Sequence, residues 1–154
     1  MSDMEKFKKN KKELLRHIKK LNTKFEYLSE MYSIPINSKF IEQIMENDID
    51  DAIDVIGYRF SKLQDRLGRT IKLYLDIQGE NIENLAMMDI LHIARSYKIE
   101  IDDQFWNDLK KLKNSVLYEY DDDYEKIANT INQIYLKVRK LTTIIDIIAG
   151  RVNK

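Results

Sequence analysis

Acidic and histidine side chains are the first candidates for a chemical site in this sequence. Asp121–Asp123 form a cluster, and the pair Asp102–Asp103 lies upstream. Such carboxylates suggest a magnesium site. However, acidic residues that precede a helix also cap its free amide groups and offset its dipole, and this explanation is favoured. His17 lies among lysines and is expected to be solvated, and His92 is expected to flank a helix. Because neither histidine has a second ligand at helical spacing, no metal site is predicted.

Two further segments place polar residues where a helix could present them together. In residues 58–68, Gln64 and Asp65 are flanked by apolar residues at helical spacing. A glycine inside a helix costs about 1 kcal/mol relative to alanine, so Gly68 predicts a close helix crossing. Residues 106–123 end a predicted helix with an amide and two phenols close to the acidic turn, namely Asn114, Tyr118 and Tyr120.

The composition excludes several classes of protein. The chain has 154 residues, no cysteine and 26 basic residues balanced by 26 acidic ones. It therefore has no thiolate site, and its net charge does not by itself indicate a nucleic-acid or membrane partner. Without an apolar leader or a long apolar run, we expect a cytoplasmic protein with no membrane partner. No glycine-rich phosphate loop or other cofactor motif occurs, so no cofactor is predicted.

Apolar residues recur at helical spacing along nearly the whole chain. The pattern predicts helices over residues 3–31, from Asn37 or Ser38 to near 47, from about 48–51 to 78, from Asn81 or Asn84 to 97, from Asp102 or Asp103 to about 120, and from 124 to near 150. Gly79 is expected to stop the third helix. In the fourth, Leu85, Met88, Leu91 and Ile93 are expected to face inward. The predicted fold is one all-α domain over residues 1–154, an antiparallel bundle of four main helices with one or two short ones.

One set of residues resembles a known family. The segment around position 64 matches it at Arg59, Phe60, Lys62, Leu63, Gln64, Asp65, Leu67 and Gly68, and Met88–Leu91 and Trp106 follow in the expected order. In this order and spacing they resemble the HEPN superfamily, in particular HepT-like toxins of bacterial toxin–antitoxin pairs. The resemblance covers about residues 50–140.

This resemblance implies an RNase motif of arginine, four residues and histidine, where Lys113 and Tyr118 stand here. Lys113 would supply charge to the scissile phosphate, without the two-pronged geometry of arginine, and Asn114 would hydrogen-bond. Tyr118 is a poor general base, because a phenol has an unperturbed pKa of about 10. Arg59 and Asp65 would support the same cleft. Cleavage without a metal is therefore expected to be weakened or lost. On spacing alone, the favoured explanation is a solvated Lys113 beside half-buried tyrosines.

The resemblance also implies partners, namely a second copy of the chain, RNA, and a minimal nucleotidyltransferase that adenylylates Tyr120. Three hypotheses stay open: a weakened RNase toxin, a non-catalytic relative that docks the nucleotidyltransferase or a nucleotide, and a helical interaction module unrelated to nucleic acid. The lysines of residues 8–24 are expected to form a solvated face, with phosphate binding as the alternative.

Overall fold

The protein is described here from a computed structural model, which describes residues 1–47, 51–117 and 123–151. These residues form helices and no strand, so the predicted all-α class is confirmed. The helices are α1 (Asp3–Met31), α2 (Ser38–Glu46), α3 (Asp51–Ile77), α4 (Met87–Ser96), α5 (Asp103–Leu117) and α6 (Tyr124–Arg151).

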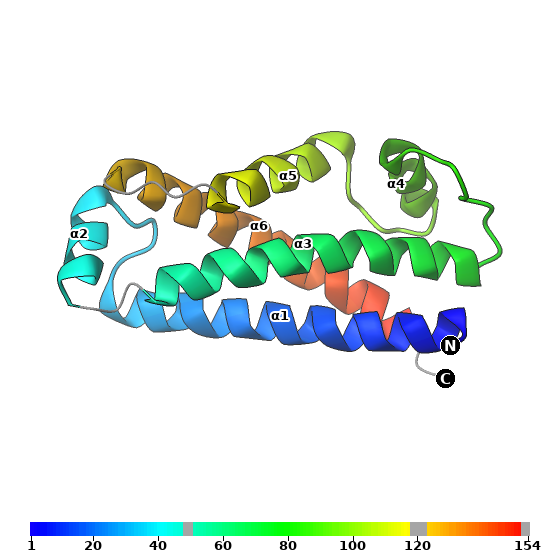
Figure 1. The fold of residues 1–154 in the computed structure, drawn as a ribbon, viewed down its shortest axis with the longest axis horizontal. Helices are drawn as coiled ribbons and strands as arrows, with labels where there is room; N and C mark the ends of the chain where they lie inside the picture. The colour runs from blue at the N-terminus through cyan, green and yellow to red at the C-terminus, as the bar shows by residue number, and fades with distance from the viewer. Residues whose placement is uncertain (48–50, 118–122, 152–154) are drawn as a thin grey trace.

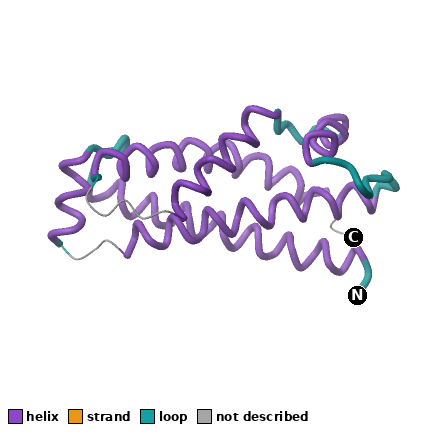
Figure 2. Tube along the Cα trace, turned by 45° about the horizontal axis from the view of Figure 1, so that its top comes forward, coloured by secondary structure: helices purple, strands orange, loops and turns teal. Residues whose placement is uncertain are grey.

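The long helices α1, α3 and α6 pack together with α5 into an elongated bundle (Figure 1). α1 and α3 lie side by side and run in opposite directions, and α6 packs against both. α5 lies over α3 and also contacts α6. The short helices α2 and α4 lie at opposite ends of the bundle, as the tube in Figure 2 also shows.

The predicted apolar stripes form the core. In α1, Phe7, Leu14 and Leu21 recur every seven residues and are completely buried. Seven residues correspond to about two helical turns, so these side chains lie on one face. Each buried side chain of this kind contributes about 1.5–3 kcal/mol of transfer free energy. The buried stripe of α3 is equally regular and contains Ile56, Phe60, Leu63, Leu67 and Ile71. Together these stripes form part of the apolar core between the packed helices α1 and α3.

Short polar side chains start four of the described helices, and in α1 the hydroxyl of Ser2 accepts a hydrogen bond from the N–H of Glu5 at 3.2 Å. The side-chain oxygens of Asn37, Asp102 and Asp123 each accept a hydrogen bond from the backbone N–H three residues later, at 3.0, 2.7 and 3.1 Å. Asp123 therefore caps α6, as predicted for the acidic turn; Asp121 and Asp122 lie outside the described residues. Gly79 ends α3 with a φ of +87°, which glycine adopts without strain.

The fourth helix begins later than predicted. It starts at Met87, so the prediction that Asn81 or Asn84 opens it was wrong. Asn84 has a φ of +69°, which does not fit a right-handed helix, and Ala86 stands at the N-cap without a side-chain hydrogen bond. Of the four residues predicted to face inward, Leu91 is buried and Met88 and Ile93 pack partly buried against the core, so only Leu85 contradicts the prediction. Leu85 is 39% exposed, and the buried residues of α4 are Ile90, Leu91 and Ala94.

The hydropathy of the described helices varies along each of them with their amphipathic pattern. None of them combines the length and apolar character needed to cross a lipid bilayer.

Candidate functional site

α3 and α5 cross closely at Gly68. The indole ring of Trp106 lies over this glycine, and a Cβ at position 68 would be 3.4 Å from Trp106 Cη2. Both residues are buried. The predicted close crossing is therefore present, and its partner is a residue from the other segment that carries the family resemblance.

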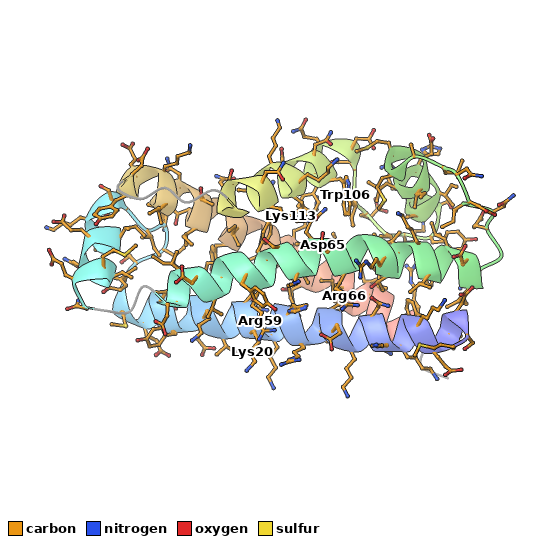
Figure 3. All side chains as sticks on the ribbon, viewed as in Figure 1. Lys20, Arg59, Asp65, Arg66, Trp106 and Lys113 are labelled. Carbon is orange, nitrogen blue, oxygen red and sulfur yellow. The ribbon has the colours of Figure 1, made fainter. Side chains whose placement is uncertain are left out.

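An ion pair joins the same two helices at the solvent edge of this crossing. Lys113 Nζ donates to Asp65 Oδ1, and the two side chains are 25% and 44% exposed. α3 and α5 run in opposite directions. Gly68 follows Asp65 along α3, and its partner Trp106 precedes Lys113 along α5, so the two contacts lie one after the other along the crossing (Figure 3). The structure thus brings two predicted site residues, Asp65 and Lys113, into direct contact.

The other residues of the predicted motif are placed less completely. Asn114 follows Lys113 on α5 and is exposed. Tyr118 and Tyr120 lie outside the described residues, so their predicted roles in proton transfer and modification stay predictions.

Arg59 faces a different neighbour from Asp65. Its guanidinium lies towards α1, where Nη1 is 3.2 Å from His17 Nδ1 (Figure 3). A helix turns by about 100° per residue, so the side chains of Arg59 and Asp65, six residues apart, point about 120° away from each other. They therefore lie on different faces of α3. Arg59 therefore does not contact the Asp65–Lys113 pair.

His17 is buried, and the prediction that it is solvated was wrong. Its exposed fraction is only 5%. Arginine has no acceptor atom, so Nδ1 must accept the hydrogen bond from Arg59, which places the proton on Nε2. Nε2 is 3.9 Å from a carboxylate oxygen of Glu13. Burial lowers the pKa of His17, and the charge of Arg59 lowers it further. The neutral imidazole is thus the form that this site favours.

The described part of the α3–α5 crossing contains no imidazole. His17 lies between α1 and α3, and His92 is exposed on α4 with its Nδ1 3.5 Å from Arg95. Lys113 is a partly exposed cation at the crossing, and Asp65 compensates part of its charge. In the described ranges, no three His, Asp or Glu side chains are grouped so that they could hold a metal ion.

Comparisons with known proteins leave the resemblance as an inference from the sequence. No family model, curated protein or solved structure matches the chain.

A hollow near α4 contains none of the predicted site residues. It has a volume of about 410 Å³, is open to solvent, and is lined by Lys72, Asp76, Ile82, Glu83, Asn84, Leu85 and Ile90. Its lining mixes both charge signs, so it favours no one class of ligand.

Sequence reasoning did not identify Arg66 as a partner of α1. Arg66 Nη1 donates to Asn10 Oδ1 at 3.1 Å. Arg59 and Arg66 are seven residues apart, as are their partners Asn10 and His17. This matched spacing on two antiparallel helices was the available signal, because residues seven apart share a helix face.

Proposed function

We propose that this protein is an RNA-directed, HEPN-like component of a toxin–antitoxin pair whose endoribonuclease activity is weakened or lost. The observation that supports the proposal is the contact between the two segments that carry the resemblance. Gly68 packs against Trp106, and Asp65 pairs with Lys113, although each pair is far apart in sequence. A shared site would require such an approach.

The weakened activity follows from the groups at this crossing. A lysine lacks the fork with which arginine holds a phosphate at two oxygens. In addition, a phosphate that binds Lys113 must compete with the carboxylate of Asp65. Tyr118 replaces the histidine of the family motif, and its high unperturbed pKa disfavours general base catalysis at neutral pH.

The ion pair also favours a second candidate function. A lysine held by a carboxylate can serve as a structural contact, as expected of a non-catalytic protein that docks a minimal nucleotidyltransferase or a nucleotide.

In both functions we propose a cytoplasmic homodimer, with Tyr120 as the residue that the partner enzyme would modify. Light scattering on the purified protein tests the dimer, and transfer of labelled AMP to wild type but not to Tyr120→Phe tests the modification.

An RNA-cleavage assay separates the two candidates. Wild type is compared with the double variant Lys113→Ala/Tyr118→Phe and with Lys110→Ala, all in EDTA. Lys110 is an exposed lysine on the same helix and serves as the matched control. Slow cleavage by wild type and Lys110→Ala that disappears in the double variant would support the weakened RNase. Absence of cleavage in all three would favour the non-catalytic protein.

A further inference from the structure

Cations gather along neighbouring faces of α1 and α3, beside the Asp65–Lys113 pair. We name this surface the basic face and define it by six residues: Arg16, Lys20, Arg59, Lys62, Arg66 and Arg69. The four on α3 follow the spacing i, i+3, i+7 and i+10, which places them in one stripe along the helix. Figure 3 shows Lys20 on α1 at the level of Arg59 on the neighbouring α3.

Contacts to α1 hold two of these guanidinium groups in place. Arg59 bonds to His17 and Arg66 bonds to Asn10, and both acceptors are buried. At 1.5 Å per residue, the two arginines are spaced about 10 Å apart along α3. Each guanidinium has five N–H donors, so a single hydrogen bond to α1 leaves others for a ligand. Fixed cations at a regular spacing suit a ligand with repeating negative charges.

The charge of the basic face is compensated only in part within the described residues. Arg16, Lys20, Lys62 and Arg69 form no ion pair with any carboxylate there. Two acidic groups lie at this face. Glu13 lies beside the imidazole of His17, and Asp65, three residues after Lys62 and four before Arg69, pairs with Lys113. Because the whole chain has zero formal net charge, this concentration of cations is a local feature. A polyanion gains most from such a surface, since its binding releases condensed counterions.

An exposed aromatic ring adjoins the cations. Tyr58 is 56% exposed, and both the Arg59 guanidinium and Lys62 Nζ lie 5.6 Å from its ring centroid. Aromatic rings beside cations are platforms on which unpaired bases stack. Lipid surfaces instead favour helices with apolar side chains on the exposed face. The apolar stripe of α1 is buried in the bundle, which favours nucleic acid over membrane.

We propose that the basic face, with Tyr58 at its edge, binds the phosphate backbone of single-stranded RNA. The surface would hold RNA whether or not the α3–α5 crossing cuts it. The preference for RNA over single-stranded DNA rests on the proposed function, whereas the preference for a single-stranded polyanion rests on the surface itself.

The test measures binding of fluorescently labelled oligo-uridine by anisotropy, in EDTA and over a range of salt concentrations. The target variant is Lys20→Gln/Lys62→Gln/Arg69→Gln. Its matched control is Lys39→Gln/Lys98→Gln/Arg139→Gln, which changes the net charge equally at exposed positions elsewhere. Arg59 and Arg66 are left intact because they also bond to α1.

We expect the target variant to bind about tenfold to a hundredfold more weakly at 0.1 M salt, while the control binds like wild type. The slope of log affinity against log salt should fall by about 2, or about 0.7 for each lost phosphate contact. Tyr58→Ala should weaken binding about tenfold, and Tyr58→Phe should retain it. Equal losses in target and control, or no binding by wild type, would overturn the proposal. The proposal would also be overturned if the target variant lost binding to phosphatidylserine vesicles but bound RNA like wild type.

The variant Lys113→Ala keeps this proposal separate from the proposed function. If the basic face is correct, Lys113→Ala binds RNA within about twofold of wild type even where cleavage is absent, because an exposed ion pair contributes little. RNA binding that depends on Lys113 but not on the target residues would refute the basic face and leave the proposed RNA-directed site standing.

Discussion

Lys113 on α5 donates a hydrogen bond to the carboxylate of Asp65 on α3, across 48 positions of sequence. The contact joins the two segments that resemble the HEPN motif. It also occupies the cation that the motif would present to a phosphate. This relationship supports the proposed location of the site and contributes to its proposed weakness.

Removal of the carboxylate should release Lys113. We expect Asp65→Asn to increase residual RNA cleavage about twofold to fivefold, because an exposed ion pair contributes about 0.2–1 kcal/mol. The free energy of unfolding should change by less than about 1 kcal/mol, measured by urea denaturation. The control is Asp54→Asn, an exposed acid near the start of the same helix. A decrease in cleavage would instead make Asp65 a supporting residue of the site.

The buried His17 should make stability depend on pH. Its pKa is lowered in the folded state by burial and then by Arg59, so the unfolded chain binds the proton more readily. The resulting stability is complete above the unfolded pKa of about 6.5 and is lost as pH falls from there through the folded pKa. We therefore expect the free energy of unfolding to decrease as the pH is lowered from about 7.5 to about 5.

The variant His17→Gln should reduce this pH dependence, because glutamine can accept from Arg59 without titrating. Urea unfolding at several pH values measures the effect. His92→Gln is the control, since it removes the other, exposed imidazole. If both variants kept the wild-type pH dependence, His17 would not be its source.

Gly68 should tolerate alanine but not a larger side chain. A Cβ would meet Trp106 at 3.4 Å, which is ordinary contact, and alanine favours helix by about 1 kcal/mol. Gly68→Leu should force the indole away and destabilise the fold by about 1–3 kcal/mol. Thermal unfolding followed by circular dichroism measures both. Equal stability of the two variants would show that the crossing is not tight.

Asn132 should be important for attaching the segment before α2 to α6. Its side chain accepts from the N–H of Ile36 and donates to the carbonyl of the same residue, both at 2.7 Å. Asn132→Ala removes both bonds and should cost about 1–3 kcal/mol in urea unfolding. Gln133→Ala is the adjacent exposed control. A loss below about 0.5 kcal/mol would show that water replaces the amide without cost.

The long helices could be predicted because their apolar periodicity extends over many turns. The seven-residue repeat of Phe7, Leu14 and Leu21 determines one face of α1 independently of its neighbours. His17 was misjudged because adjacent lysines suggested solvation, although its position three residues after Leu14 places it near the buried stripe. The start of α4 was missed because asparagine is both a cap and a residue that adopts a left-handed turn, as Asn84 does.

Contacts between distant segments were harder to predict than the segments themselves. Gly68 indicated a helix crossing, but nothing local to it identified Trp106 as the partner. Likewise, Asp65 and Lys113 were each named from the sequence, yet their pairing depends on how α3 and α5 are rotated about their axes. Such rotation is set by packing over the whole bundle.

The contact between the beginning of α1 and the end of α6 affects how the chain can fold during synthesis. Lys11 Nζ donates to the carbonyl of Ala149 at 3.2 Å, across 138 positions. The ribosome releases α1 first and α6 last, at about 5–20 residues per second. The apolar stripe of α1 can pack against α3 early. The side of this pair that α6 covers stays exposed until α6 itself has been synthesised. Nascent α1–α3 hairpins are therefore the intermediates that we expect chaperones to bind.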